Sequence, residues 1–557
     1  MTRPDVTIIG AGAGGGAAAL ALTRRGLTVQ ILEAGPRFDP DKDFRLDRPD
    51  WESQHFPHKP GSLGQYRFGN LQTLDPRWDT LRSWNANLGR FNDSDQRRAS
   101  GDGYHHVRGV GGSTLYYTGE AHRMNRHSMR MQSRFGVAAD WPMDYESLEP
   151  WYRLAEEVIG VAGPGPSDDR PGPRDHLQPP HPLGSASRRL AVGASALGLS
   201  WVANDRAALS IAREGRPACN YCGNCTRGCP RRDKGSVDMT FIRDAEATGR
   251  LSILTGVQVT RLLTDSTGRI TDVEIWHGDE RRAERIPVNQ LILAGGAIES
   301  PRLLLASAND DWPTGLANRA GQVGQHFMET LFWSSSALAD LPLASFKALP
   351  SDSICWDFNR PDSIEGVIGG CRFSTSTCET NLCGPIEYAK RVVSGFGHQL
   401  KQGVRDQLGN VVTVGAIGES LPNAGSFVDL HPADKEPSGM PIARIHSYLD
   451  EQELSRLQFM ADTSRRLLNA AGASAPFEEY GSYDFFSATH VFGTCRMGND
   501  AAKSVVNVDL RSHDHANLYI MDGSVFPSSG GGESPSLTIS ALALAAGDSM
   551  ASQLTKS

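Results

Sequence analysis

Residues 5–35, DVTIIGAGAGGGAAALALTRRGLTVQILEAG, contain the pattern that decides the fold of this chain. The apolar run Val6–Ile9 predicts a buried strand, and Gly10-x-Gly12-x-x-Gly15 predicts a tight turn directly after it. The Ala/Leu-rich segment that follows predicts a helix, and LTVQILE predicts a second strand. Strand, glycine turn, helix and strand within about 30 residues form the unit that binds dinucleotides. The stretch therefore predicts a Rossmann-like domain in an α/β fold.

The residue types of this unit indicate how a dinucleotide would bind. The glycines let the backbone approach a pyrophosphate, whose charge then lies at the N-terminus of the helix. Glu33, at the end of the second strand, is placed to accept hydrogen bonds from the hydroxyls of the adenosine ribose. An acidic residue there disfavours the 2′-phosphate of NADP. FAD and NAD share the unit, so the choice between them depends on the rest of the chain.

Length and composition limit the possible classes of protein. A chain of 557 residues exceeds one ordinary hydrophobic core, which predicts two or three domains. No apolar run approaches the roughly 18 residues that span a bilayer, so no membrane insertion is expected. The chain opens on its first strand without an export signal, which predicts a cytoplasmic protein. A net charge of −8 argues against a nucleic-acid partner and is compatible with a cationic substrate, although ordinary solubility also explains it.

Four further segments carry glycine turns or a conspicuous histidine. They are HVRGVGGSTLYYTG at 106–119, VNQLILAGGAIESPRLLLAS at 288–307, HVFGTCRMG at 490–498 and NLYIMDGSVFPSSGGGESPSLTISALALAAGDSM at 517–550. In this order, and together with the N-terminal unit, they resemble the glucose–methanol–choline (GMC) flavoprotein oxidoreductases. The resemblance runs from one end of the chain to the other.

The resemblance implies FAD as the cofactor and names the residues that would contact it. The GVGGST loop would lie against the flavin and its phosphates, Val259 would lie near the adenine, and the Asp522-Gly523 pair would approach the pyrophosphate and ribityl chain. The loop residues concerned are Gly109, Gly111, Gly112, Ser113 and Thr114. Some relatives bind the flavin covalently through a histidine of this loop, but the aligned position here is Tyr116, so we expect non-covalent FAD.

The resemblance also implies a discontinuous FAD-binding domain and a second domain for the substrate. Residues 1–310 would form the first part of the FAD-binding domain, interrupted by a cysteine-bearing insertion near 215–235. Residues 311–485 would be mainly the substrate-binding domain with a largely antiparallel sheet, which gives an α+β character overall. Residues 486–557 would complete the FAD-binding domain and carry the catalytic histidine. Within the second domain, GNVVTVGAIGE and SFVDLHP predict strands, and EQELSRLQFMADTSRRLLNAAGA predicts an amphipathic helix.

Three residues near the C-terminus are candidates for catalysis. In the resembled family the histidine of the H-x-x-G-T-C segment takes the hydroxyl proton of an alcohol, and it corresponds to His490. A neutral imidazole suits that work at neutral pH. The second active-site position of the family, His or Asn, corresponds to Ser534, whose hydroxyl can bond an alcohol directly or through water. Glu533 could act as a second base or as an anchor for a substrate ammonium group.

The stretch ACNYCGNCTRGCPRRDKGS, residues 218–236, holds four of the nine cysteines of the chain. A zinc ribbon needs two separated cysteine pairs, and two disulfides would be cramped and unusual in the cytoplasm. The spacing C-x2-C-x2-C-x3-C-P is that of bacterial ferredoxins, which favours a 3Fe-4S or 4Fe-4S cluster. The candidate ligands are Cys219, Cys222, Cys225 and Cys229.

Similar cysteine segments occur in a branch of the GMC family that includes catalytic subunits of bacterial sugar dehydrogenases. There, the resemblance implies, a cluster passes electrons from the reduced flavin to a redox partner protein or another acceptor. The position of Cys222 is not always cysteine in that branch, so the other three are the safer ligands.

The leading hypothesis is an FAD- and cluster-dependent dehydrogenase that oxidises an alcohol, here a primary hydroxyl of a sugar-like substrate. The same branch includes enzymes that oxidise the 6′-hydroxymethyl group of aminoglycosides, which suggests a role in antibiotic biosynthesis. Three alternatives remain: an oxidase that reduces oxygen directly and has structural cysteines, a non-redox lyase, and an electron-transfer subunit.

Overall fold

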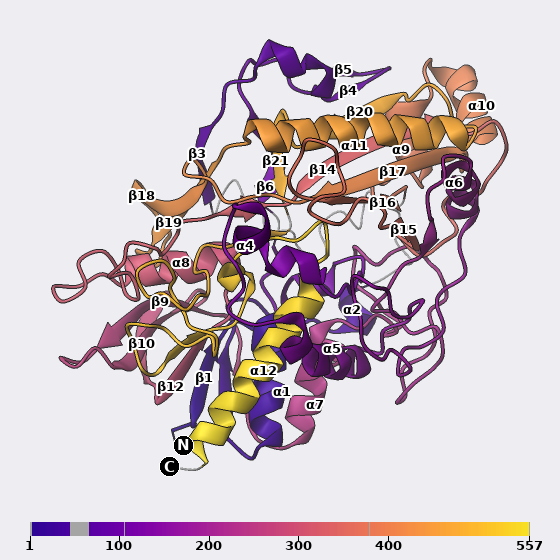
Figure 1. The fold of residues 1–557 in the computed structure, drawn as a ribbon. Coiled ribbons are helices and arrows are strands. Elements are labelled where there is room, and N and C mark those ends of the chain that lie inside the picture. The colour runs from indigo at the N-terminus through magenta and orange to yellow at the C-terminus, as the bar shows by residue number, and fades with distance from the viewer. Residues whose placement is uncertain (1–2, 45–65, 105, 378, 489, 556–557) are drawn as a thin grey trace.

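A parallel sheet of five strands is assembled from the beginning, the middle and the end of the chain (Figure 1). The computed structural model describes residues 3–44, 66–104, 106–377, 379–488 and 490–555. Each strand of this sheet pairs with its neighbours in parallel. The strand order is β23 (Leu518–Ile520), β12 (Gln290–Leu293), β1 (Val6–Ile9), β2 (Val29–Leu32), β8 (Leu251–Leu254). This arrangement confirms the Rossmann-like prediction.

The helix after β1 begins earlier than the sequence predicts. Helix α1 (Ala13–Arg24) starts inside the glycine run, so Gly14, Gly15 and Gly16 are helical. A Cβ atom on Gly14 would lie 1.6 Å from the carbonyl oxygen of Met521, and one on Gly16 would lie 2.3 Å from the side chain of Val237. The helix therefore packs closer to its neighbours than a residue with a side chain would allow.

Two helices cover α1 in this half of the molecule. The C-terminal helix α12 (Ser536–Leu554) packs along α1 and also contacts α5 (Tyr145–Ile159), while α7 (Phe241–Ala247) packs on α1 as well. The yellow helix and the indigo helix in the lower part of Figure 1 are α12 and α1, which shows both ends of the chain in one layer. The segment 288–307, with its glycine turn, forms β12 and α8 (Gly296–Ala306).

An antiparallel sheet of eight strands forms the opposite half of the molecule (Figure 1). The amphipathic helix α11 (Glu451–Ala470) packs on β14 and β17 and is capped by Asp450, whose carboxylate accepts the backbone N–H of Glu453. The strand order is β5 (Gly89–Arg90), β4 (Trp84–Asn85), β20 (Glu478–Gly481), β14 (Leu331–Leu338), β17 (Val411–Gly418), β16 (Cys371–Thr375), β15 (Ser353–Cys355), β7 (Val202–Ala203). The predictions of β17 and α11 are confirmed.

The domain limits drawn from the sequence stay a prediction, but the sheet membership refines them. Strands β4, β5 and β7 belong to the eight-stranded sheet although they precede residue 310. One large hydrophobic core surrounds the parallel sheet, and a second lies between the antiparallel sheet and α11. Both halves therefore draw on segments that are far apart in the sequence.

Four smaller sheets complete the described part of the fold. One is a three-stranded meander, one combines an antiparallel and a parallel pair, and two are single pairs. They are β9 (Val257–Thr264), β10 (Ile270–His277) and β11 (Arg282–Pro287); β18 (Phe427–Lys435), β19 (Pro441–Ser447) and β3 (Tyr66–Leu71); β13 (Met328–Glu329) with β22 (Val491–Phe492); and β21 (Phe485–Ala488) with β6 (Arg98–Tyr104).

The remaining helices are short or lie at the edges. They are α2 (Pro40–Asp43), α4 (Met131–Phe135), α6 (Ser185–Ala196), α9 (Pro385–Glu387) and α10 (Gly397–Gln407). Among the residues that the structure describes, no helix combines the length and apolarity needed to cross a membrane.

Candidate active site

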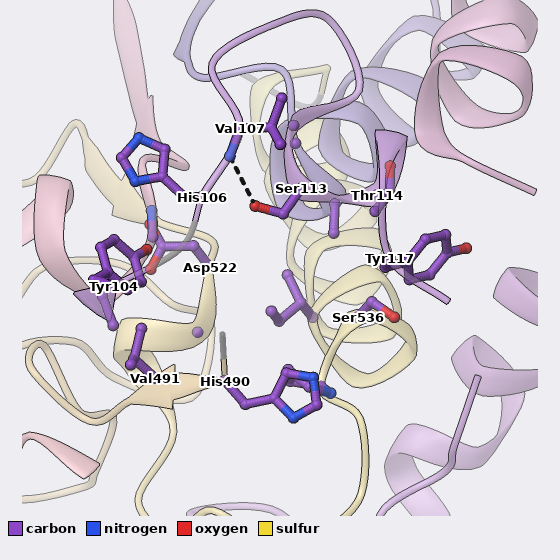
Figure 2. Close-up of a pocket in the computed structure, with 18 of the residues that line it drawn as sticks. Tyr104, His106, Val107, Ser113, Thr114, Tyr117, His490, Val491, Asp522 and Ser536 are labelled. Carbon is purple, nitrogen blue, oxygen red and sulfur yellow. Dashed lines mark hydrogen bonds between the residues drawn. The ribbon is translucent and has the colours of Figure 1, made fainter. Parts of the chain in front are cut away.

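A cavity of about 590 Å³ lies between the carboxyl ends of the parallel strands and the face of the antiparallel sheet. It is lined by segments from every part of the chain, including the turn after β1, β9, β14, β16, β17 and the start of α12. Figure 2 shows that residues of the 106–117 segment, His490 and Asp522 surround a common space. Of the predicted site residues, those that line the cavity are Gly10, Gly12, Glu33, Gly112, Ser113, Thr114, Val259, His490, Asp522, Gly523 and Ser534.

One side of the cavity, here called the glycine wall, consists of Gly10, Gly12 and Gly112 with their neighbouring backbone. Gly10 has a φ of +99°, and a Cβ atom on it would lie 2.5 Å from the carbonyl oxygen of Ala294. A Cβ atom on Gly112 would lie 2.8 Å from the Cα atom of Gly12, so the two predicted glycine turns approach each other directly. Gly12 is also the N-cap of α1. A pyrophosphate beside this wall would meet exposed backbone and the N-terminus of a helix.

Three predicted glycines belong to the turns of this wall but do not line the cavity: Gly15, Gly109 and Gly111. A Cβ atom on Gly15 would lie 2.0 Å from the carbonyl oxygen of Gly10. The hydroxyl of Thr114 donates to the carbonyl of Gly111 at 2.6 Å, which closes the turn of the GVGGST loop.

Two carboxylates hold the backbone at the ends of the glycine wall. Glu33 accepts the N–H groups of Ala11 at 2.9 Å and Gly35 at 2.8 Å, and burial raises the pKa of this carboxyl. Asp522 accepts the N–H of Gly296 at 2.9 Å and the hydroxyl of Ser300 at 2.6 Å. The two side chains therefore connect β2 to the first turn and β23 to the start of α8.

The other side of the cavity, here called the polar wall, carries Glu120, Arg372, His490 and Ser534. His490 precedes β22 and its side chain lies on the cavity, where burial lowers its pKa to about 4. The imidazole is therefore neutral at physiological pH. The charge of Glu120 acts on His490 in the direction that raises the pKa, and that of Arg372 in the direction that lowers it.

Ser534 is held by residues that the sequence did not single out. Its hydroxyl donates to a carboxylate oxygen of Glu120 at 2.8 Å, and its N–H donates to Nδ1 of His122 at 3.1 Å. Arg372 donates to the same oxygen of Glu120 at 2.6 Å. Glu120 lies six residues after the GVGGST loop, and Arg372 lies in β16, so no local motif in the sequence connects them to Ser534.

Glu379 also lines the cavity and was not predicted. Its carboxylate accepts the hydroxyl of Ser351, and its exposed surface faces the cavity. Burial in the protein, together with the charge of Glu120, raises the pKa of Glu379 to about 7. This residue adds a further carboxyl group to the cavity, and the charge of Glu120 acts on it.

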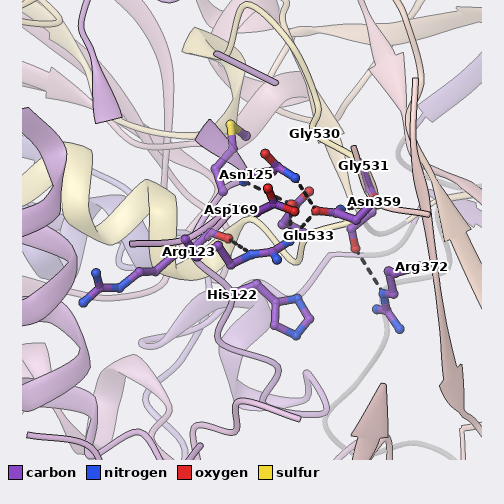
Figure 3. Close-up of polar contacts among 12 residues, drawn as sticks. His122, Arg123, Asn125, Asp169, Asn359, Arg372, Gly530, Gly531 and Glu533 are labelled. Atoms are coloured by element: carbon purple, nitrogen blue, oxygen red, sulfur yellow. Dashed lines mark hydrogen bonds and ion pairs between the residues drawn. The ribbon is translucent and has the colours of Figure 1, made fainter. Parts of the chain in front are cut away.

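Glu533 does not line the cavity, which argues against its predicted contact with substrate. Its carboxylate is buried, accepts a bond from Arg170 at 2.6 Å and accepts the N–H of Asn125 at 3.1 Å. Arg170 also donates to Asn359 at 2.6 Å, and Figure 3 shows Glu533, Asn125 and Asn359 in one buried cluster. The sequence suggested a carboxylate in a loop, but the buried guanidinium of Arg170 holds it away from the cavity.

The four clustered cysteines are free thiols and do not line the cavity. Cys222 is exposed, while Cys219, Cys225 and Cys229 are half-buried. Burial raises the pKa of Cys219 and of Cys229 to about 12. No three metal-binding side chains converge anywhere within the described ranges. The arrangement of these thiols therefore does not by itself fit an iron–sulfur cluster.

The cysteine loop is nevertheless connected to the cavity. The buried ammonium of Lys234 donates to the carbonyls of Cys225 at 2.7 Å and Leu115 at 2.8 Å. Thr226, next to Cys225, lines the cavity, and so does Tyr116, which follows the GVGGST loop. The cysteine loop and the GVGGST loop are thus joined through one buried cation.

Comparisons with known protein families agree with this geometry. The N-terminal and C-terminal models described as GMC oxidoreductase match residues 108–328 and 422–543, which together are more than half of the chain. A model described as an NAD(P)-binding Rossmann-like domain matches residues 8–40.

Individual relatives span nearly the whole chain. The fructose dehydrogenase large subunit of Gluconobacter japonicus is 29% identical over 99% of this chain and 98% of its own length. The 6'''-hydroxyparomomycin C oxidase of Streptomyces lividus is 29% identical over 99% of this chain and 92% of its own length. The crystal structure of pyridoxine 4-oxidase from Mesorbium loti has the same fold, with a TM-score of 0.63, 17% identity and full coverage of both chains.

Proposed function

The chain belongs to the GMC oxidoreductase family, whose members act on CH–OH groups, and from this premise we propose an FAD-dependent dehydrogenase that oxidises a sugar-like alcohol. One observation carries the proposal: a neutral imidazole, His490, faces the same cavity as the two glycine turns. A dinucleotide cradle and a proton acceptor in one cavity are the two requirements of alcohol oxidation by a flavin.

The glycine wall fits FAD. Gly10 has no room for a Cβ atom, and Gly112 approaches Gly12 too closely to carry one. The N-terminus of α1 lies beside these glycines. These features would hold the pyrophosphate, while Glu33 and Val259 would lie toward the adenosine half. FAD, when bound, supplies the two-electron acceptor for the hydride of the alcohol.

His490 would take the hydroxyl proton of the substrate. Its pKa of about 4 keeps a ring nitrogen free to accept a proton throughout the physiological range. The imidazolium that forms would be stabilised by the negative charge of Glu120. Ser534 and Glu120 would bind the substrate beside His490, and Glu533 would support the loop without touching the substrate.

The substrate class rests on the relatives and on the polar character of the cavity. Two of the relatives are named for a sugar and for an aminoglycoside, and Glu379 adds a carboxyl group that would suit a cationic sugar. We propose a primary hydroxyl of a sugar-like or aminoglycoside-type substrate, in a pathway of antibiotic biosynthesis. A cytoplasmic location stays a prediction from the sequence.

The iron–sulfur cluster also stays a prediction, and no step above depends on it. A cluster would pass electrons from the flavin to a partner protein, whereas free thiols would suit an oxidase that reduces oxygen directly. Iron, sulfide and flavin are therefore measured on anaerobically purified protein. About three or four iron atoms per flavin would support the cluster, and flavin without iron would refute it, with rapid peroxide formation then favouring the oxidase.

The main test is anaerobic reduction of the flavin by a panel of alcohols. The wild-type flavin should bleach with at least one polyol, and His490→Ala should bleach about 10²- to 10⁴-fold more slowly because the proton acceptor is lost. The variant should retain its flavin. A matched control is Ser540→Ala, since Ser540 lies on α12 outside the cavity and donates to the backbone carbonyl of Ser536. Full activity of His490→Ala would contradict the proposal.

A further inference from the structure

Two residues of the polar wall, Ser534 and Glu120, and two residues behind it, His122 and Asn204, form a closed ring of hydrogen bonds. Ser534 donates its hydroxyl to Glu120 at 2.8 Å and its backbone N–H to Nδ1 of His122 at 3.1 Å. Nε2 of His122 bonds Oδ1 of Asn204 at 2.8 Å, and Nδ2 of Asn204 donates to the other oxygen of Glu120 at 3.0 Å. His122 and Asn204 are fully buried, so the ring is shielded from solvent.

The direction of every bond in this ring is determined. Nδ1 of His122 must accept, because the partner is a backbone N–H, so the ring proton is on Nε2 and is donated to Asn204. Asn204 then has its oxygen toward His122 and its NH₂ toward Glu120, which is consistent with its second donation to the carbonyl of Ser351 at 2.9 Å. Burial lowers the pKa of His122 to about 3, in agreement with this neutral tautomer.

Glu120 is held as a carboxylate by two arginines. Arg372 donates to it at 2.6 Å, and the guanidinium of Arg206 lies 4.0 Å away. An ionised carboxylate accepts hydrogen bonds and donates none, so the hydroxyl proton of Ser534 is committed to Glu120. The oxygen of Ser534 therefore faces the cavity with its lone pairs, as an acceptor.

This polarity limits what Ser534 can do for a substrate. In an alcohol oxidation the reacting hydroxyl gives its proton to the base, here His490, so that hydroxyl has no proton left for Ser534. An acceptor beside the base binds a donor on another part of the substrate. Resting on the proposed function, we propose that Ser534, polarised by Glu120, recognises a second hydroxyl close to the one being oxidised, so the enzyme selects polyols over simple alcohols.

The alternative arrangement is less favourable. If the Ser534 hydroxyl turned to donate to the reacting oxygen, Glu120 would lose a charge-assisted hydrogen bond in a buried environment. A neighbouring hydroxyl of the substrate satisfies the free lone pairs without breaking the ring. Selection of a polyol thus follows from the bonds already present.

Anaerobic stopped-flow reduction of the flavin in the holoenzyme tests the proposal. The substrates are 1,2-propanediol and 1,3-propanediol against 1-propanol, and methyl α-glucoside against its 4-deoxy analogue. The quantity compared is the rate of flavin reduction divided by the dissociation constant of the substrate. In the wild type this quotient should be about 10- to 100-fold higher for the better diol than for 1-propanol, and for methyl α-glucoside than for its 4-deoxy analogue. A ratio of this size corresponds to one polarised hydrogen bond. Most of the ratio should lie in the dissociation constant, because the bond is to a group that does not react.

Two variants assign the ratio to Ser534 and its partner. In Ser534→Ala the ratio should fall below about threefold, since the acceptor is gone. In Glu120→Gln the ratio should fall as well, because an amide can donate to Ser534 and free its hydroxyl proton. Ser540→Ala, the control on α12 outside the cavity, should keep the wild-type ratio. A general distortion of the site would slow both substrates and leave the ratio unchanged.

The outcomes separate this inference from the function on which it rests. Reduction of the wild-type flavin by 1-propanol as readily as by the diols would overturn the inference and leave alcohol oxidation intact. A ratio that persists in Ser534→Ala would also overturn it, including when Glu120→Gln fails to fold. Failure of every alcohol to reduce the flavin would instead refute the proposed function.

Discussion

The glycine wall and the polar wall of the cavity are built by opposite means. The glycine wall presents backbone, and its shape depends on side chains that are absent at Gly10 and Gly112. The polar wall presents functional groups, and its shape depends on a ring in which Glu120 and Ser534 meet although they are more than 400 residues apart. The glycine wall can thus be recognised from two short sequence motifs, whereas the side chains of the polar wall come together only when the chain folds.

The largest expected effect concerns the buried charges that support the polar wall. Glu533→Gln should lower the free energy of unfolding by about 3 kcal/mol, because the buried Arg170 loses its counter-charge. Chemical denaturation of the holoenzyme measures this change. Glu274→Gln is the matched control, since its partner Arg285 is exposed and the expected loss is below about 1 kcal/mol.

The same variant also tests the role that the sequence suggested for Glu533. If Glu533 anchored a substrate ammonium group, Glu533→Gln would selectively raise the KM of cationic substrates. Because Glu533 lies outside the cavity, the ratio of KM values for a cationic and a neutral substrate should change less than about twofold, well below the effect of one lost charged hydrogen bond. A selective rise would contradict the structural assignment.

The second prediction addresses the glycine wall. Gly10→Ala should weaken FAD binding about 10- to 100-fold, since its φ of +99° strains a side chain and its Cβ atom would lie 2.5 Å from the carbonyl oxygen of Ala294. Titration of apoprotein with FAD measures the affinity. Gly26→Ala provides the control, because Gly26 has a φ of +89° with nothing within 4 Å of a Cβ atom. It should lower the melting temperature and leave FAD affinity unchanged; equal loss of affinity in both variants would show that strain alone is responsible.

The smallest expected effect is on the pH dependence of flavin reduction. A histidine base must be neutral, and one with the ordinary pKa of about 6.5 would lose roughly 30-fold in rate between pH 7 and 5. With its pKa lowered to about 4, His490 stays mostly neutral at pH 5, so the rate with an uncharged alcohol should change less than about twofold. A steep fall below pH 6.5 would mean that His490 is not shielded as the structure indicates.

The same lowered pKa values have a consequence for stability. The unfolded chain binds protons at His490 and His122 below about pH 6.5, whereas the folded protein does so only near pH 4 or below. The contribution of these two histidines to the free energy of unfolding should therefore decrease as the pH falls from 6.5 toward 4, and be fully retained above 6.5. Chemical denaturation of the wild type and of His490→Ala at pH 7.5 and 5 isolates the share of His490, because the wild type should lose more stability than the variant.

The sequence predicted most of what is local. The strand Val6–Ile9, the strand at β17 and the helix α11 are confirmed because hydrophobic periodicity and caps act over a few residues. The start of α1 was predicted too late, because tight packing of Gly14 and Gly16 against distant segments lets a glycine run become helical.

Nonlocal features were outside the reach of sequence reasoning. No sequence pattern near Glu120 predicts that Asn204, Arg372 and Ser534 form hydrogen bonds with it. Likewise, Glu533 and Ser534 are neighbours in the chain, yet one is buried against Arg170 and the other opens onto the cavity. Which of two adjacent polar residues faces a site is decided by long-range packing.

The order of strands in the parallel sheet has a consequence for folding during synthesis on the ribosome. Strand β1 leaves the ribosome about 500 residues ahead of β23, which covers the free edge of β12, and of α12, which covers α1. At ordinary rates of synthesis this interval is roughly half a minute to two minutes. In the later part of that interval, once β12 has been made, its edge is an open template for pairing with other chains. The parallel sheet therefore closes late in synthesis, and FAD can bind its complete site only after β23 and α12 have been made.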